Sequence, residues 1–330
     1  MLLRRKSTVF GCAVLFACAP GAGMAQQQAA KGYPSKPIRL VVPVVAGGTN
    51  YIIGQMLGQK MGPSMGQNLV IDTRPGAGGA IGSAVVAKSA PDGHTLLLYS
   101  NGHTILPSIV KNLPYDPVKD FTAITMVVRS VGNILVVHPS VPARSVQQLI
   151  ALAKNNPGKL NYGSGGVGSP MHFASESFNM MAGTRITHIP LKGVAQAIID
   201  LVGGHLDVSF VSALSGIGHI RSGKLRAIGI TATKRWNELP DVPTLDEAGV
   251  KGYSYVSWYG LWFPAGTPTE YVTRIRTEVV KALEDPATRR AFTEQGLIPV
   301  GSTPREFNRE IIEGIALHRK LAAQMGLAQR

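Results

Sequence analysis

The chain has 330 residues, enough for two ordinary domains, and a formal net charge of +14. Its two cysteines, Cys12 and Cys18, both lie within the first 25 residues. A chain processed after that segment would have no disulfide and no thiolate to act as a nucleophile or metal ligand. Beyond residues 4–6, lysine and arginine are spread along the chain, at most two together, and form no basic run. The charge therefore indicates a basic surface and we expect no binding of nucleic acid.

The first 25 residues have the pattern of a secretory signal peptide. Basic residues at 4–6 precede an apolar run at 9–19, and the small-x-small sequence at 23–25 suits cleavage. The apolar run is too short to span a bilayer. We therefore expect export to a bacterial periplasm. Lipoprotein processing at Cys18 is an alternative, although the bulky Phe16 is unusual for such a site.

From residue 38 onward, short apolar runs alternate with segments of helical periodicity. The runs are rich in valine, isoleucine and leucine without polar alternation, which is typical of strands buried on both faces of a parallel sheet. We expect strands at 38–43, 68–72, 95–99, 133–138, 160–162, 186–189, 207–211 and 226–231. We expect helices between them at 51–61, 79–89, 145–155, 170–182 and 193–203. This alternation predicts α/β domains with open sheets.

The C-terminal third has a different pattern. After a turn-rich segment at 264–268, helical periodicity runs over 268–284, 286–296 and 304–326. Proline suits the first helical turn, and the last two of these segments each begin with one. We expect the long terminal helix to pack over one domain.

Two glycine-rich loops each follow a strand-like run and precede a helix, at 46–50 and 162–169. Glycine lets the backbone approach a ligand closely, and the free N–H groups of the next helix can hold a carboxylate or phosphate. Thr49, Asn50, Ser164 and Ser169 add polar side chains. For either loop alone, a tight strand-to-helix turn explains the glycines equally well. The pair fits a cleft between two domains better.

A third glycine-rich stretch, at 74–82, fails the dinucleotide fingerprint, because Ile81 occupies the third glycine position. We interpret it as structural, with a chance of lining the cleft. No catalytic pattern stands out: Ser164 lacks the first glycine of G-x-S-x-G. The eight histidines include no H-x-x-x-H or H-E-x-x-H. We therefore expect no catalytic residue, no metal site and no cofactor.

These loops, in this order, resemble the substrate-binding proteins of tripartite tricarboxylate transporters, the Bug or TctC family. The resemblance covers the chain after the signal segment. It is carried by YPSKPIRLVVP (33–43), RPGAGGAIGS (74–83), APDGHTLLL (90–98), LPYDPVKDFTAI (113–124), NYGSGGVGSPMHFASESF (161–178), HIPLKGVAQAIIDLVGGHLDVSF (188–210), GKLRAIGIT (223–231), LPDVPTLDEAG (239–249) and WYGLWFPAGTP (258–268). None of these motifs is decisive by itself, but the ordered combination is specific.

The resemblance implies a periplasmic-binding-protein-like, Venus-flytrap fold with a ligand cleft between two α/β domains. Domain one would comprise 33–135 plus 256–330, and domain two 136–255. It also implies capture of a small organic carboxylate in the periplasm and delivery to the membrane permease subunits of a tripartite tricarboxylate-type transporter. We expect a monomer. Two rival functions stay open: an orphan ligand sensor for a signalling receptor, and a secreted serine hydrolase that uses Ser164 or Ser169.

The first loop departs from the pattern P-F-x-x-G-G-x-[ST]-D that is common in the family. Asn50 replaces serine or threonine, and Tyr51 replaces the aspartate. An aspartate can meet an amino group on a ligand, whereas Tyr51 cannot pair with an ammonium in that way. We therefore expect an unaminated mono- or dicarboxylate, with Tyr51 able to stack on an aromatic ring. A second departure is Leu191, where an aromatic residue is usual.

We expect ligand-binding residues from both domains. Domain one would contribute Gly47, Gly48, Thr49, Asn50 and Tyr51, together with Asn101 and its neighbours Ser100 and His103 after the strand 95–99. Domain two would contribute Ser164, Gly165, Gly166, Gly168, Ser169, Gly193, Ala195 and Asp207. For Asp207, capping of a turn before a strand is the alternative.

Overall fold

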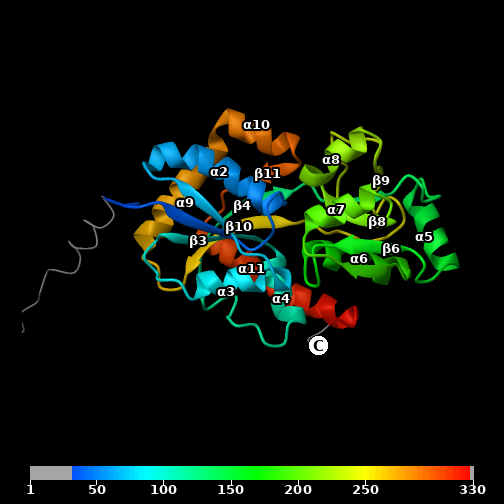
Figure 1. The fold of residues 1–330 in the computed structure, drawn as a ribbon, viewed down its shortest axis with the longest axis horizontal. Helices are drawn as coiled ribbons and strands as arrows, with labels where there is room; N and C mark the ends of the chain where they lie inside the picture. The colour runs from blue at the N-terminus through cyan, green and yellow to red at the C-terminus, as the bar shows by residue number, and fades with distance from the viewer. Residues whose placement is uncertain (1–31, 328–330) are drawn as a thin grey trace, which may run out of the picture. The chain divides into compact units, whose positions relative to one another are not determined.

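The strands of the chain form two mixed sheets in a computed structural model that describes residues 32–327 (Figure 1). The predicted signal peptide and the alternative site at Cys18 lie outside the described residues. Residues 34–330 form one compact unit, which contains both sheets. We call each sheet with its covering helices a lobe, the first lobe being the one that contains the first strand.

The first lobe has a six-stranded sheet in the order β11-β4-β10-β3-β1-β2. The strands β1, β2 and β3 are parallel, whereas β10 runs antiparallel to both β3 and β4. The sheet is therefore mixed, not wholly parallel as the apolar runs suggested. The bounds are β1 (Ile38–Val42), β2 (Leu69–Thr73), β3 (Thr95–Ser100), β4 (Phe121–Ser130), β10 (Trp258–Pro264) and β11 (Leu297–Pro299).

Helices cover both faces of this sheet. Figure 1 shows α2, α9 and α10 on one side and α3, α4 and α11 on the other. Leu40 and Leu98 point to the α2 side, where they pack against Gly54 of that helix. Val41 and Leu97 point to the opposite side. The bounds are α2 (Thr49–Met65), η1 (Ala77–Gly79), α3 (Ala80–Ala87), α4 (Gly102–Ile109), α9 (Thr269–Glu284), α10 (Pro286–Glu294) and α11 (Pro304–Gln324).

The second lobe has a five-stranded sheet in the order β7-β6-β8-β5-β9. The strand β6 is parallel to both β7 and β8, whereas β5 is antiparallel to β8 and β9. The bounds are β5 (Asn133–Val137), β6 (Asn161–Ser164), β7 (Thr187–Pro190), β8 (Val208–Ser212) and β9 (Arg226–Ile230). The helices of this lobe are α5 (Val146–Asn155), α6 (Pro170–Ala182), α7 (Val194–Val202) and α8 (Ala213–Arg221).

The chain passes between the two sheets twice, once between β4 and β5 and once between β9 and β10. The two passages are hydrogen-bonded to each other, because Ser130 N–H donates to Ser257 O and Ser257 N–H donates to Ser130 Oγ. The strand β5 begins at Asn133, two residues before the predicted domain bound. The division into 33–135 plus 256–330 and 136–255 stays a prediction.

The terminal helix α11 packs on both lobes, so the expectation that it covers one domain was wrong. Phe307 and Ile315 belong to the core of the first lobe. Two turns further on, Ala322 belongs to the core of the second. His318 lies between them, with its ring edge-on to Phe173 at 5.1 Å between ring centroids. The helix is long enough to reach both sheets, and its apolar stripe continues along its whole length.

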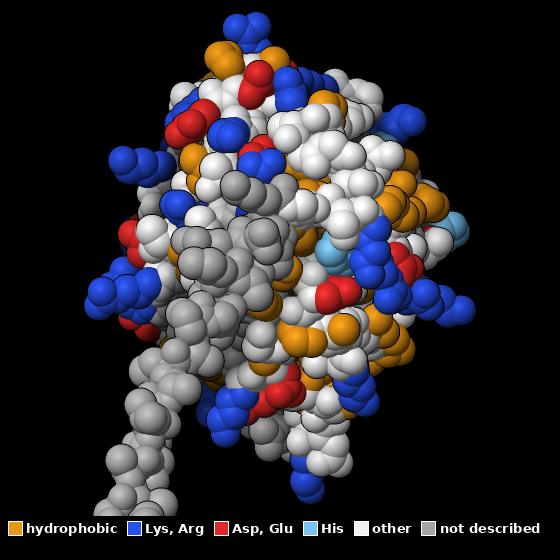
Figure 2. Space-filling model, turned by 90° about the vertical axis from the view of Figure 1, so that its left-hand side faces the viewer, with side chains coloured by type: hydrophobic (Ala, Val, Ile, Leu, Met, Phe, Trp, Pro, Cys, Tyr) orange, Lys and Arg blue, Asp and Glu red, His pale blue; other side chains and the backbone are white. Residues whose placement is uncertain are grey.

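The basic residues of the chain do not gather in one patch on the face shown in Figure 2. Lysine and arginine side chains are distributed over this face with acidic and uncharged side chains among them. The view agrees with the sequence, in which these residues are spread along the chain after residue 6. A distributed positive charge of this kind attracts small anions over long range.

Candidate functional site

A cavity of about 570 Å³ lies between the lobes. Its walls come from the carboxyl-terminal ends of β3 and β8 and from the segments that follow β1 and β2 in the first lobe and β6 and β7 in the second. Ligands of α/β proteins bind beyond the carboxyl ends of strands. The lining includes Val44, Val45, Gly48, Thr49, Asn50, Gly76, Gly78, Tyr99, Ser100, Asn133, Gly165, Gly166, Val167, Ser169, Met171, Leu191, Lys192, Gly193, Val194, Ser212, Ser257 and Tyr259.

Several helices begin at this cavity, and they differ in how their first turns are capped. Ser169 caps α6 by accepting from His172 N–H, and Ser212 caps α8 by accepting from Ser215 N–H. The helices α2 and α7 begin after Gly48 and Gly193, which have no side chain for this purpose. Their first N–H groups carry the partial positive charge of a helix start. Two uncapped helix starts, one from each lobe, therefore face the same cavity.

Hydroxyl groups join the two lobes at the cavity wall. Thr49 Oγ1 at the start of α2 lies 3.1 Å from Ser212 Oγ at the start of α8. Ser212 Oγ also lies 2.7 Å from Ser215 Oγ. Asn50 lines the wall beside Thr49 and is 6% exposed, and its Oδ1 has no hydrogen-bond partner. This part of the cavity is polar.

The rest of the lining is mainly apolar, with Val45, Met171, Leu191 and Val194 among its residues. Within the described part of the chain, the lining contains no carboxylate side chain, and its single charged residue is Lys192. A cavity that combines helix starts, one cation and no acidic group favours an anion. The apolar walls suit a ligand with a carbon skeleton.

Eight of the predicted ligand-binding residues line this cavity. They are Gly48, Thr49, Asn50, Ser100, Gly165, Gly166, Ser169 and Gly193. The third glycine stretch, which we interpreted mainly as structural, also lines it through residues 75–79. Sequence reasoning missed Val45, Lys192, Ser212, Ser257 and Tyr259. A serine directly after a strand is a helix-cap signal that could have identified Ser212.

Eight predicted residues are not among the lining residues: Gly47, Tyr51, Asn101, His103, Ser164, Gly168, Ala195 and Asp207. Tyr51 is half-buried in the first turn of α2. Because Tyr51 does not line the cavity, the structure gives no support to stacking of its ring on a ligand. Asn101 instead donates from Nδ2 to the Tyr255 hydroxyl at 3.0 Å. Gly168 packs so closely on α4 that a Cβ there would lie 2.6 Å from Ile109 Cδ1.

Two neighbours of Asn101 behave differently from each other. Ser100 lines the cavity, as expected. His103 is fully buried among the rings of Phe121 and Trp262, and its Nε2 lies 2.8 Å from Pro117 O. Its role is therefore in the core of the first lobe.

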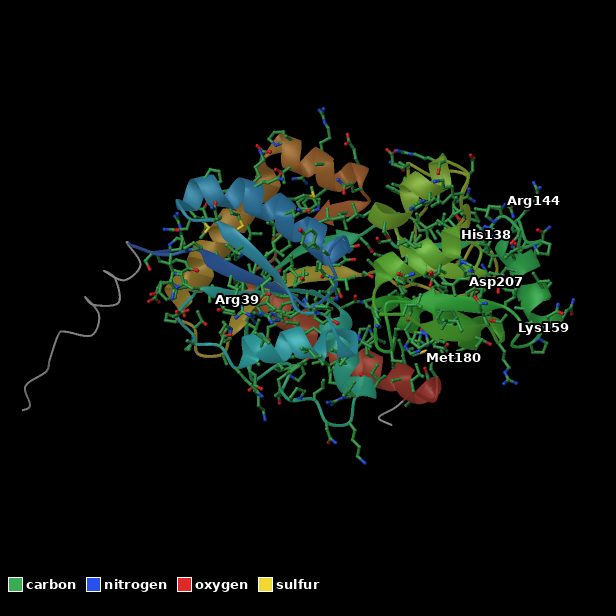
Figure 3. All side chains as sticks on the ribbon, viewed as in Figure 1. Arg39, His138, Arg144, Lys159, Met180 and Asp207 are labelled. Carbon is green, nitrogen blue, oxygen red and sulfur yellow. The ribbon has the colours of Figure 1, made fainter. Side chains whose placement is uncertain are left out.

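Asp207 holds two strands together and does not reach the cavity. Its carboxylate accepts from Asn161 N–H at 2.8 Å, and its own N–H donates to Asn161 Oδ1 at 3.1 Å. It precedes β8, whereas Ser212 at the other end of β8 lines the cavity. Figure 3 labels Asp207 within the second lobe. These contacts favour a structural role for Asp207 over ligand binding.

Ser164 lies close to His188, a pairing that the sequence spacing did not reveal. Ser164 Oγ is 2.7 Å from His188 Nε2, because β6 and β7 are neighbouring parallel strands. The His188 ring stacks on His172 at 4.2 Å between centroids. Burial lowers the pKa of both imidazoles to about 4, and for His172 the neighbouring His188 adds to the effect. Ser164 is fully buried, so its hydroxyl supports the glycine loop and is not presented to a substrate.

Comparison with known proteins gives the family. The sequence profile of the tripartite tricarboxylate transporter family receptor matches residues 53–327. The chain belongs to this family. The protein BugT of Bordetella pertussis is 35% identical over 285 residues, which cover 86% of this chain and 87% of that protein.

Solved structures of the receptor family match the fold. The chain is similar to a protein of R. palustris solved with adipate, at 34% identity and a TM-score of 0.87, covering 90% of this chain and 100% of that one. It is also similar to MatC from Rhodopseudomonas palustris with bound malate, at 28% identity and a TM-score of 0.84, covering 88% and 99%. The family and fold are those of periplasmic substrate-binding proteins.

Two features are absent from residues 32–327. No helix there combines the length and the apolar character needed to cross a membrane. No group of three or more histidine, aspartate or glutamate side chains in this part of the chain is arranged to hold a metal ion.

Proposed function

We propose that this chain is a periplasmic solute-binding protein that captures an unaminated organic mono- or dicarboxylate and passes it to the permease subunits of a tripartite tricarboxylate-type transporter. Residues 1–25 would direct export and be removed. The carboxylate would lie at the uncapped starts of α2 and α7. The ligand-contacting set would be the predicted residues that line the cavity, with Val45, Lys192 and Ser212 added to them.

The observation that carries this proposal is the pair of uncapped helix starts, Gly48–Thr49 and Gly193–Val194, in a cavity without a lining carboxylate. Backbone N–H groups at a helix start need a partner, and a carboxylate supplies the charge that the helix dipole favours. An ammonium group would find no carboxylate in the lining. The binding of adipate and malate by the two similar structures supports the same ligand class.

A substitution at Gly48 tests the site directly. Gly48 has φ −76° and ψ 164°, the backbone conformation of an ordinary N-cap residue, and a Cβ there would make only van der Waals contacts, the nearest at 3.4 Å from Val45 O. In Gly48→Asp the protein's own carboxylate would occupy the N–H groups of α2. We expect this variant to lose carboxylate binding while its unfolding free energy stays equal or rises by a few tenths of a kcal/mol.

The matched control is Gly48→Ala, which adds the Cβ without the charge and should retain binding. The assay is thermal shift followed by titration calorimetry with succinate, adipate, terephthalate and glutamate, since a ligand that binds only the native state raises its apparent stability. Failure of every carboxylate to bind the unmodified protein would overturn the proposed function. Undiminished binding by Gly48→Asp would remove the α2 start from the site.

The hydrolase alternative has one specific observation, the Ser164–His188 contact. Within the described residues no carboxylate hydrogen-bonds His188, so the third member of a triad is missing there. Turnover of an ester that disappears in Ser164→Ala would favour this alternative. The sensor alternative uses the same cavity, and uptake of the ligand by a strain lacking the protein separates it from transport.

A further inference from the structure

The second glycine loop lines the cavity at residues 165–167, and two of its backbone N–H groups have no acceptor. They are those of Gly165 and Val167, for which the described part of the chain offers no hydrogen-bond partner. Gly165 is half-buried and Val167 is 56% exposed. The loop also lies beside the uncapped start of α7, because a Cβ on Gly165 would be 3.4 Å from Val194 N. These two N–H groups are therefore the donors that the loop leaves for a ligand.

The other N–H groups of the loop are held by side chains of the second lobe. Gly166 N–H donates to Ser164 Oγ at 3.1 Å, and Gly168 N–H donates to His172 Nδ1 at 3.3 Å. Ser164 Oγ also lies 2.7 Å from His188 Nε2. The held N–H groups alternate along the loop with the two that have no acceptor. The contacts to Ser164 and His172 therefore decide which donors remain for a ligand.

The two histidines belong to a stack of three rings. The His188 ring lies against His172 at 4.2 Å and against Tyr162 at 4.9 Å between ring centroids. The Tyr162 hydroxyl donates to the Glu176 carboxylate, and Glu176 follows His172 by one turn of α6. The stack thus joins β6, β7 and α6, and it fixes the position of both imidazoles next to the loop.

His172 can hold the loop only in its neutral form. A backbone N–H group can only donate, so Nδ1 of His172 must be unprotonated and the ring hydrogen lies on Nε2. Burial lowers the pKa of His172 to about 4, and the neighbouring His188 adds to the effect. The imidazole is therefore neutral near pH 7 and able to accept from Gly168.

We propose that His172 and His188 are positioning residues for the ligand carboxylate, which act through the glycine loop without touching the ligand. His172 fixes Gly168 directly, whereas His188 fixes Gly166 through Ser164. Neither histidine is among the residues that line the cavity. This inference rests on the proposed function, because it assumes that a carboxylate binds in this cavity. It adds two residues outside the lining that set the affinity.

Two substitutions of His172 separate positioning from a general structural role. His172→Leu places an apolar side chain in the site, which cannot accept from Gly168 N–H. In His172→Asn the Oδ1 atom is as many bonds from Cα as Nδ1 is in histidine, so it can accept in the same place. By calorimetric titration with succinate, adipate and terephthalate, we expect Kd to rise about five- to tenfold in His172→Leu and to stay within about twofold in His172→Asn.

The same comparison applies at His188, where glutamine carries a polar atom at the distance of Nε2. His188→Leu should raise Kd by a similar factor, and His188→Gln should restore most of the affinity. Ser177→Ala is the matched control on α6, because it removes the buried contact of Ser177 Oγ with Met325 Sδ and leaves the glycine loop unchanged. This control should keep the Kd of the unmodified protein.

Unchanged affinity in both leucine variants would overturn the inference. Equal weakening in His172→Leu and His172→Asn would also overturn it, because the lost acceptor would then not be the cause. If a leucine variant does not fold in a urea titration, Ser164→Ala replaces it, since this change removes only the Oγ that joins His188 to Gly166. Unchanged affinity in Ser164→Ala would likewise refute the role of the loop contacts.

Failure of this inference and failure of the proposed function give different results. If no carboxylate binds the unmodified protein, the proposed function fails. If carboxylates bind the unmodified protein and the histidine variants equally well, the proposed function stands and the positioning role of the two histidines is refuted.

Discussion

The contact between Val45 and Gly193 gives a direct test of whether the two lobes must approach each other to bind. Val45 belongs to the loop after β1 in the first lobe, and Gly193 precedes α7 in the second. A Cβ placed on Gly193 would lie 2.5 Å from Val45 Cγ2. Gly193 has φ 172°, an extended conformation that any residue can adopt, so Gly193→Ala introduces a clash between lobes without backbone strain.

The magnitude follows from that distance. Carbon atoms pack at about 3.5–4.0 Å, so the lobes or the Val45 side chain must shift by about 1 Å to admit the new methyl group. Overpacking of this kind costs about 1–3 kcal/mol. We predict that the lobes separate in the ligand-free protein, so that the clash opposes only the ligand-bound form with the lobes together. The cost should then appear as a roughly 5- to 150-fold increase in ligand Kd. The unfolding free energy should change less, by the small effect of alanine at a helix N-cap.

A second substitution in the partner residue separates the clash from other causes. Val45→Ala removes Cγ2 and leaves Cβ as the nearest Val45 atom, at 3.5 Å from the new methyl group. The double variant should therefore bind nearly as well as Val45→Ala alone, with an interaction energy of about 1–3 kcal/mol between the two sites. Gly218→Ala is the matched control, because a Cβ there meets no atom within 4 Å.

The assay is calorimetric titration with the tightest carboxylate, together with urea unfolding of each variant. Unchanged affinity in Gly193→Ala would show that the approach of the lobes is irrelevant to binding. Weaker binding that Val45→Ala does not restore would trace the loss to the start of α7 itself and refute the steric reasoning.

Three further predictions follow from buried and redirected side chains. Burial lowers the pKa of His103 and His318 to about 4, so between pH 6.5 and pH 4 the unfolded chain binds protons that the native protein does not. The unfolding free energy should therefore fall as the pH is lowered from about 6.5 to 4. An unfolding free energy from urea titrations that stays constant over this pH range would contradict the prediction. Asp207→Ala leaves Asn161 N–H unpaired and should cost about 1–3 kcal/mol of stability with an unchanged Kd, whereas a weakened Kd would put Asp207 in the site. Tyr51→Ala should leave the preference between aromatic and aliphatic carboxylates within about twofold; selective loss of aromatic ligands would reinstate stacking.

Local sequence signals predicted most of the elements, because they act between residues that are close in the chain. All eight predicted strands are present, with bounds that differ by one or two residues. The helix α6 spans Pro170–Ala182 as predicted, since Ser169 and Gly183 are strong start and stop signals. The missed helix α8 does have a start signal, in Ser212, whereas the missed helix α4 has none. The helix α4 has eight residues that are all buried, including Pro107, so it shows no polar face to reveal its period.

The direction of neighbouring strands in the sheets also could not be predicted from local sequence. Apolar runs indicated buried strands, but burial on both faces does not distinguish a parallel neighbour from an antiparallel one. The strand β10 is apolar and aromatic throughout and lies between β3 and β4, far from both in the chain. Its partners depend on how the chain returns from the second lobe, which no short stretch of sequence encodes.

The sequence by itself determined the family, the two-lobed α/β fold and the two glycine loops that form walls of the cavity, because motifs, caps and apolar periodicity are local properties. The tertiary structure decided which side chains meet in the cavity. It placed Ser212 against Thr49, left Asn50 Oδ1 without a partner and brought Val45 onto Gly193. It also moved Tyr51 out of the specificity argument. The Thr49–Ser212 and Val45–Gly193 contacts join residues from different lobes, so they depend on how the two lobes pack together.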